Sequence, residues 1–224
     1  MQHAKQDISE IASIALEAFA LLDLDIVAEL FKIGQSKCGN LLYEWNTHQE
    51  TTAHTIQLPY LMTQLRRIKP KRVLEVGTNC GFFCYFAKSV LPDVKIVTFD
   101  SEAAARSSKA VDFLNAHFDS DDITFVKGDS QWAFPSFVDD FSIKTDMPID
   151  FAWIDGSHDY FPVLSDLNSA GELGIPHIYV DDYHNIEDVR VATSVFSNSF
   201  PYNLVGVTRD FRGIAYLKKE GSDG

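Results

Sequence analysis

Residues 73–81 of the chain read VLEVGTNCG, and this stretch decides the fold. Its first half is a short apolar run rich in β-branched side chains, which is typical of a buried strand. Gly77 and Gly81 follow, and they permit a tight turn with a close approach of the backbone to a ligand. Glu75 lies inside the apolar run, where a carboxylate is costly unless it meets a cation or hydrogen-bond donors. The stretch therefore predicts a strand that ends in a ligand-binding turn.

The same stretch argues against a dinucleotide as the ligand. A dinucleotide-binding turn has the pattern G-x-G-x-x-G, in which the glycines fit a pyrophosphate. Counted from Gly77, the chain has Asn79 and Phe82 where the second and third glycines would stand. A ligand without phosphates, approached through one glycine turn, suits the pattern better.

Outward from this stretch, short apolar runs alternate with segments of helical periodicity. Strands are predicted over residues 72–76, 94–99, 123–126, 150–154 and 178–180. The helices between and after them are predicted over residues 80–91, 102–117, 131–138, 160–171 and 186–198. The tail adds two strands joined by a turn, at residues 203–208 and 213–218. This order predicts an α/β fold: a doubly wound, mostly parallel, seven-stranded Rossmann-like sheet that ends in an antiparallel hairpin.

An N-terminal helical segment is predicted over residues 1–58, before a ligand-binding domain over residues 59–224. Residues 7–33 carry apolar positions at helical spacing. That apolar face lies outside the repeating strand–helix pattern, and it would be exposed unless something covers it. It predicts a homodimer, with packing onto the domain's own sheet as the alternative.

The composition excludes several classes of protein. The 224 residues are 46% hydrophobic and 23% charged, which indicates a globular protein with a sizeable core. The formal net charge of -13 repels phosphate backbones, so no nucleic-acid partner is expected, whereas a cationic ligand or a divalent metal is attracted. No uninterrupted apolar run reaches the ~18 residues of a membrane span. The N-terminus lacks a signal-peptide pattern and the three cysteines form no disulfide framework, which favours a cytoplasmic location.

Polar residues follow the second and third predicted strands. Ligands of such sheets bind beyond the carboxyl ends of the strands, at the point where the strand order reverses. Asp100 and then Ser101 end the second strand, where an acidic side chain accepts both ribose hydroxyls. Asp129 and Ser130 follow the third strand and supply short polar groups for an adenine edge. Asp129 is equally well explained as a helix N-cap.

The fourth and fifth strands aim three carboxylates at one place. Asp155 and His158 follow the fourth strand, and Asp181 and Asp182 follow the fifth. Like charges this close raise each other's pKa unless a cation neutralises them, and oxygen ligands favour Mg²⁺, with Mn²⁺ or Ca²⁺ as alternatives. His158 suits proton removal near neutral pH, and His184 is the alternative base. The competing explanation is that the aspartates are capping and turn residues.

These motifs resemble the class I S-adenosylmethionine-dependent methyltransferases over roughly residues 60–218. In that family the residue matching Glu75 interacts with the methionine part of the cofactor and the one matching Asp100 binds the ribose. The residues matching Asp129 and Ser130 lie near the adenine. The resemblance predicts S-adenosylmethionine as the cofactor, bound by Glu75, Gly77, Thr78, Gly81, Asp100, Ser101, Asp129, Ser130 and Asp155.

The catalytic half resembles metal-dependent O-methyltransferases: catechol O-methyltransferase, the macrocin and mycinamicin sugar O-methyltransferases, and the cephalosporin-hydroxylase-like proteins. The resemblance rests on residues 155–158, which read DGSH, and residues 181–184, which read DDYH. It departs from the pattern at Asp181, where relatives usually have glutamate. The resemblance implies His158 as the general base and a metal ion held by Asp155, Asp181 and Asp182.

The sequence thus predicts a methyltransferase that depends on S-adenosylmethionine and a divalent metal. The expected acceptor is a hydroxyl of a small molecule, such as a sugar, polyol or catechol-like natural product, because a metal can chelate two adjacent oxygens. Two alternatives stay open. One is a metal-independent methyltransferase acting on nitrogen or a carboxylate, and the other is a non-transferase cofactor-binding protein on the same scaffold.

Overall fold

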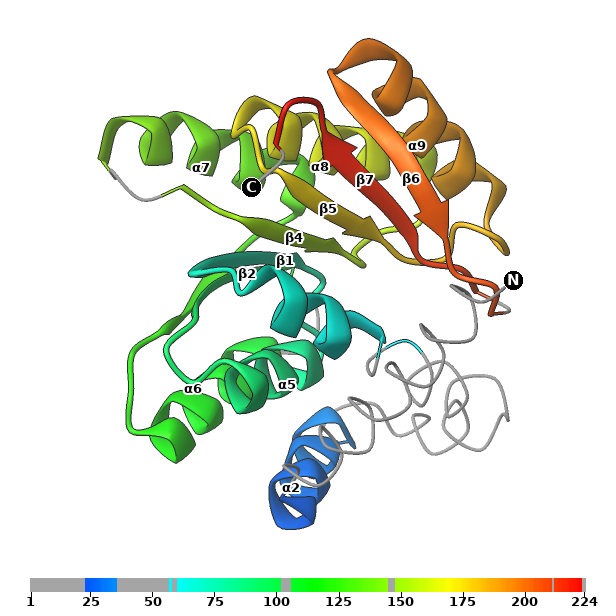
Figure 1. The fold of residues 1–224 in the computed structure, drawn as a ribbon. Coiled ribbons are helices and arrows are strands. Elements are labelled where there is room, and N and C mark those ends of the chain that lie inside the picture. Colours follow the sequence, from blue (N-terminus) through cyan, green and yellow to red (C-terminus); the bar gives the residue numbers. More distant parts are fainter. Residues whose placement is uncertain are drawn as a thin grey trace.

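The computed structural model describes residues 23–35, 57, 60–101, 106–144, 148–210 and 212–222. A seven-stranded sheet in the order β3-β2-β1-β4-β5-β7-β6 runs through its centre (Figure 1). The strands are β1 (Arg72–Val76), β2 (Lys95–Asp100), β3 (Ile123–Lys127), β4 (Phe151–Ile154), β5 (His177–Val180), β6 (Tyr202–Val207) and β7 (Ala215–Lys219). Strands β1 to β5 pair in parallel, and β7 runs antiparallel to both β5 and β6. The predicted doubly wound sheet with a terminal hairpin is confirmed.

Helices cover both faces of the sheet (Figure 1). One face carries α2 (Leu24–Gln35), the helical residues 60–68, α5 (Phe82–Val90) and α6 (Ser107–Phe118). The other carries α7 (Ser130–Lys144), α8 (Tyr160–Glu172) and α9 (Glu187–Ser199). Neighbouring residues of a strand point to opposite faces, so Val73 packs with the first group and Leu74 with the second. The central strands are apolar on both sides for this reason, and α7 extends to Lys144, beyond its predicted end at residue 138.

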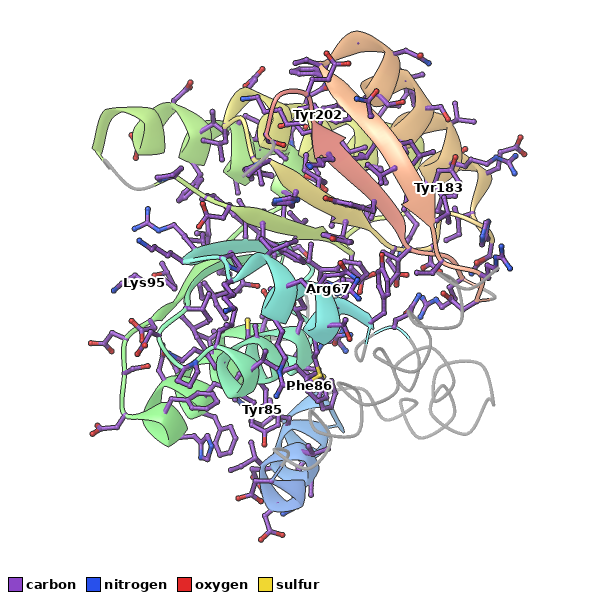
Figure 2. All side chains as sticks on the ribbon, viewed as in Figure 1. Arg67, Tyr85, Phe86, Lys95, Tyr183 and Tyr202 are labelled. Atoms are coloured by element: carbon purple, nitrogen blue, oxygen red, sulfur yellow. The ribbon has the colours of Figure 1, made fainter. Side chains whose placement is uncertain are left out.

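The apolar face of α2 is covered by the domain itself. Leu30 is fully buried, and Ile26, Val27 and Ile33 pack against the core on the α5 and α6 side of the sheet. The hydroxyl of Tyr85, labelled beside α2 in Figure 2, accepts a hydrogen bond of 2.8 Å from the backbone N–H of Asp23. Residues 24–33 therefore follow the alternative of packing on their own domain, and this helix gives no support to the predicted homodimer. Residues 7–22 lie outside the described part of the chain.

The reversal of strand order fixes where a ligand can enter. Strands β1 and β4 are neighbours, but the chain leaves β1 for α5 on one face and leaves β4 for α8 on the other. This divergence opens a crevice at the carboxyl edge of the sheet. Lys95 at the start of β2 and Tyr183 just after β5 mark the two opposite edges (Figure 2). Among the described residues, every helix is too short or too polar to traverse a lipid bilayer.

Candidate active site

Glu75 is a buried carboxylate at the centre of the carboxyl edge, with only 1% of its surface exposed. Its Oε2 accepts hydrogen bonds from the Thr98 hydroxyl at 2.5 Å and from the Cys84 thiol at 3.0 Å. Thr98 in turn lies 2.6 Å from the hydroxyl of Thr78. Burial raises the pKa of Glu75 to about 7 and outweighs the opposing effect of these donors. A cationic ligand group beside Glu75 would favour its ionised form.

The glycine turn after β1 is shaped by a close backbone crossing. Gly77 has a φ of 100°, and a Cβ at this position would lie 2.0 Å from the carbonyl oxygen of Asp155. Asn79 adopts a φ of 46°, which is uncommon for a residue other than glycine, and its N–H donates to Asp100 Oδ2 at 2.9 Å. Gly81, at a φ of 77°, is the N-cap residue directly before α5. The turn therefore draws the ends of β1, β2 and β4 together.

At the end of β3, Asp129 acts as a helix cap. Its Oδ1 accepts a hydrogen bond of 3.0 Å from the N–H of Gln131, and its carbonyl accepts from Trp132 and Ala133. Ser130 is the first residue of α7, and Ser101 is an exposed residue directly after β2. The capping explanation of Asp129 is thus supported, and the other Asp129 carboxylate oxygen is the atom left for a ligand.

A pocket opens between the ends of β1, β4 and β5, and its lining includes Gln57, Glu75, Gly77, Asp155 and Asp181. Gln57 belongs to the N-terminal segment, and its side-chain N–H donates to Asp181 Oδ1 at 2.5 Å. The sequence interpretation did not include Gln57, because nothing in its local pattern marks it. Three carboxyl groups in one lining favour a ligand that carries positive charge.

His158 lies between two carboxylates, and one of them, Asp155, lines this pocket. Its Nε2 is 2.9 Å from Asp182 Oδ2 and 3.6 Å from Asp155 Oδ1. The attraction of Asp155 and Asp182 for the charged imidazole raises the pKa of His158 to about 10, although burial opposes it. The ring is therefore mostly protonated at neutral pH, so His158 can remove a proton near neutrality, as expected from the sequence, only from its minor neutral form.

Asp182 accepts hydrogen bonds on both of its oxygens. The Arg212 guanidinium donates through Nε to Oδ1 at 2.6 Å and through Nη2 to Oδ2 at 2.8 Å, and Asn185 donates to Oδ1 at 3.0 Å. Burial would raise the pKa of Asp182, but His158 and Arg212 outweigh it and lower the pKa to about 2. Asp182 also has a φ of 57°, and such backbone strain is often found at functional sites. The sequence interpretation gave Arg212 no role.

The predicted oxygen-only triad is not the group that the structure brings together. Asp155, His158 and Asp182 each offer a ligand atom within 4.8 Å of the others. Asp181 is outside this group and is hydrogen-bonded to Gln57 instead. Burial, together with Asp155 and Asp182, raises the pKa of Asp181 well above its ordinary range. A raised pKa of this kind is expected of acidic groups that lie close together without a cation between them.

His184 lies on the surface, away from the pocket lining. Its Nε2 is 3.0 Å from the carbonyl oxygen of Thr208 in the turn between β6 and β7, and its ring packs against Gly213. This contact stabilises the turn between β6 and β7. Of the two predicted bases, the geometry favours His158.

Comparisons with known proteins agree with this fold. Residues 74–183 match the family model of a methyltransferase domain. An O-methyltransferase from Bacillus cereus in complex with SAH is 15% identical, with a TM-score of 0.62 over 88% of this chain and 91% of that one. TomG from Streptomyces achromogenes, in complex with SAM, is 15% identical, with a TM-score of 0.63 over 86% and 89%. CalS11, a TDP-rhamnose 3'-O-methyltransferase of calicheamicin biosynthesis, is 18% identical, with a TM-score of 0.55 over 89% and 94%. No curated protein sequence matches the chain.

The sheet order, the acidic residues at the strand ends and the matched domain define the class of the protein. It is an α/β methyltransferase of class I. The chain is accordingly an S-adenosylmethionine-dependent enzyme, as the sequence predicted.

Proposed function

We propose that the enzyme transfers a methyl group from S-adenosylmethionine to a hydroxyl oxygen of a small molecule. The observation that carries this proposal is the position of Asp155. Asp155 lines the pocket together with Glu75, and its Oδ1 lies 3.6 Å from His158 Nε2. A proton acceptor thus stands next to a pocket suited to a positively charged methyl donor.

The reaction moves one methyl group and one proton. The acceptor oxygen forms a bond to the methyl carbon while the bond from that carbon to sulfur breaks, and the sulfur keeps the electron pair. The hydroxyl proton passes to His158, which must first be neutral. Because its pKa is about 10, we expect turnover to rise with pH through the neutral range toward 10. Holding donor and acceptor in line supplies much of the remaining acceleration.

Each predicted cofactor residue receives a role in this proposal. Glu75 meets the ammonium group of the methionine part, and that positive charge favours its ionised form. Asp100 accepts the ribose hydroxyls beside Ser101, and Asp129 with Ser130 faces the adenine. The turn from Gly77 through Thr78 to Gly81, closed by Asp155, passes along the methionine part.

The predicted metal ion does not fit the donor set at this edge. Asp181 is hydrogen-bonded to Gln57, and both oxygens of Asp182 accept hydrogen bonds from Arg212. A metal held by Asp155, Asp181 and Asp182 would have to share Asp181 and Asp182 with these donors. No step of the proposed reaction is therefore assigned to Mg²⁺, Mn²⁺ or Ca²⁺.

The activities of similar proteins and the net charge of the chain support one class of methyl acceptor. TomG serves tomaymycin synthesis, and CalS11 methylates TDP-rhamnose. A sugar, polyol or catechol-like hydroxyl is the class we propose for this chain. A nucleic acid is disfavoured because the net charge of -13 repels phosphates.

Calorimetry and a methyl-transfer screen test the proposal. S-adenosylmethionine and S-adenosylhomocysteine should bind, and nicotinamide dinucleotides should not. A screen of sugars, polyols, catechols, amines and carboxylic acids with methyl-labelled cofactor should give product with hydroxyl acceptors. Product with amines or carboxylic acids alone would favour the nitrogen or carboxyl alternative. Cofactor binding without any transfer would favour a binding protein.

The predicted cytoplasmic location and homodimer remain predictions. Cell fractionation tests the location. Light scattering on the full chain tests the dimer.

A further inference from the structure

The Arg212 side chain fills the coordination capacity of Asp182. A carboxylate accepts about four hydrogen bonds or ligands through its two oxygens. Asp182 Oδ1 accepts from Arg212 and Asn185, while Oδ2 accepts from Arg212 and lies 2.9 Å from His158 Nε2. A metal ion at Asp182 would have to compete with the guanidinium on both oxygens and with the His158 ring on Oδ2. The two-point contact with a planar guanidinium is among the strongest that a carboxylate makes.

The backbone around Arg212 is also fixed by hydrogen bonds within and beside its turn. The Asp210 carboxylate accepts hydrogen bonds from the N–H groups of Arg212 at 3.1 Å and Gly213 at 2.9 Å. The N–H of His184 donates to the Arg212 carbonyl at 2.7 Å, and that of Tyr183 donates to the Gly213 carbonyl at 2.9 Å. Gly213 has a φ of 76°, and a Cβ there would lie 2.4 Å from the His184 ring. The backbone thus fixes the guanidinium against the residues that follow β5.

We infer that Arg212 is a positioning residue that takes the place of a divalent metal at this active site. This inference rests on the proposed methyl transfer. Arg212 holds Asp182, and Asp182 forms an ion pair with His158, whose Nε2 lies 2.9 Å from Oδ2. A carboxylate that orients an imidazole base in this way serves the same purpose in the Ser-His-Asp triad. The guanidinium supplies the fixed positive charge that the carboxylates of this edge require.

Mn²⁺ binding tests the inference without any methyl acceptor. Mn²⁺ is titrated into protein saturated with S-adenosylhomocysteine, and the free ion is followed by electron paramagnetic resonance. Wild type should give no saturable binding. Arg212→Ala frees Asp182 beside Asp155 and His158 and should create a saturable site. Arg209→Ala is the matched control, because Arg209 is exposed in the same turn, and it should behave as wild type.

Turnover supplies the second readout, on an acceptor found in the screen. Wild-type activity should be indifferent to EDTA. Arg212→Ala should lower kcat by about 10–100-fold, the usual cost of losing a residue that orients an active-site group. Mn²⁺ should restore part of that loss, and Arg212→Lys, which keeps the charge without the two-point contact, should fall between. A merely structural arginine would not give recovery with metal.

Two results would overturn the inference. One is saturable Mn²⁺ binding by wild type that Asp182→Asn abolishes, and the other is wild-type activity that EDTA removes and Mg²⁺ restores. Both use the wild-type protein, so they remain decisive if Arg212→Ala fails to fold. Failure of the proposed function is seen separately, as absent cofactor heat in calorimetry or absent methyl transfer in the screen, and the Mn²⁺ titration itself needs no methyl transfer.

Discussion

The two halves of the carboxyl edge draw their side chains from different distances along the chain. In the cofactor half, Glu75 lies close in sequence to Cys84 and one strand away from Thr98. In the catalytic half, Asp182 is joined to Arg212 and Asp181 to Gln57, across 30 and 124 residues. The first half is built from consecutive strand–helix units. The second is completed by the terminal hairpin and the N-terminal segment.

This difference explains why the two halves carry different charge arrangements. Glu75 has only neutral donors, a hydroxyl and a thiol, so burial dominates and its pKa rises to about 7. Asp182 has Arg212 and His158, which outweigh burial and lower its pKa to about 2. The cofactor half is therefore incomplete without a cationic ligand, whereas the catalytic half already contains its cation.

The largest expected effect is on kcat for a variant of the catalytic half, and a variant of the cofactor half should instead change cofactor affinity. His158→Ala should lower kcat by about 10²–10⁴-fold, the range for loss of a general base, and leave cofactor affinity unchanged. Asp100→Ala should do the reverse: cofactor affinity falls by about 1–3 kcal/mol because polar partners lose their acceptor, and kcat at saturating cofactor changes little. Single-turnover kinetics and calorimetry measure the two quantities. A fall in kcat alone for both variants would erase the distinction.

Removing Asp182 should have the next largest effect, on stability. Asp182→Ala leaves the half-buried Arg212 guanidinium without its carboxylate, and breaking such a pair costs about 3–5 kcal/mol. Urea unfolding of the cofactor-free protein measures the change. Asp159→Ala is the matched control, because this exposed acid follows the neighbouring strand β4, and it should change stability by less than about 0.5 kcal/mol. Equal losses in the two variants would mean that the Arg212 contact contributes nothing.

Glu75 should make the stability of the folded protein depend on pH. This stability should fall as pH rises, whereas turnover is expected to rise. The folded protein binds the Glu75 proton more tightly than the unfolded chain, so stability falls as pH rises from 4.5 to about 7. A pKa rise of this size corresponds to about 3 kcal/mol for a fully buried group. Glu75→Gln should lose this part of the slope, and saturating S-adenosylmethionine should reduce it in wild type. Identical slopes for wild type and Glu75→Gln would contradict the role of burial.

The sequence predicted the fold well because its signals are local. The strand at residues 72–76 matches β1, and the other strand predictions match the observed bounds within a residue or two. Glu75 could be singled out because a charge inside an apolar run is visible without neighbours. Arg212 could not, since its meaning depends on pairing between β5 and β7. That pairing sets Val180 opposite Ala215, and antiparallel direction then brings the residues before β7 beside those after β5.

Local pattern also did not reveal which distant residues contact Asp181 and Asp182. Asp181 and Asp182 are adjacent in sequence and were expected to act as one pair of ligands. Successive side chains near a strand end point in different directions, so Asp181 meets Gln57 and Asp182 meets Arg212. Contacts of this kind depend on how distant segments of the chain are aligned in the fold. The hydrophobic periodicity of the sequence does not reveal that alignment.

The smallest expected effect concerns Thr78, which the sequence predicted to contact the cofactor. Thr98 gives its one hydroxyl proton to Glu75, so the Thr78 hydroxyl must donate to Thr98. Thr78→Val removes one buried neutral hydrogen bond and should cost about 1 kcal/mol of stability with unchanged cofactor affinity. Thr98→Val removes a donor to the Glu75 carboxylate itself and should cost about 1.5–3 kcal/mol once that carboxylate is ionised. Calorimetry and urea unfolding at pH 8 measure both variants. A tenfold or greater loss of affinity in Thr78→Val would show that the Thr78 side chain itself, and not only the turn that contains it, contacts the cofactor.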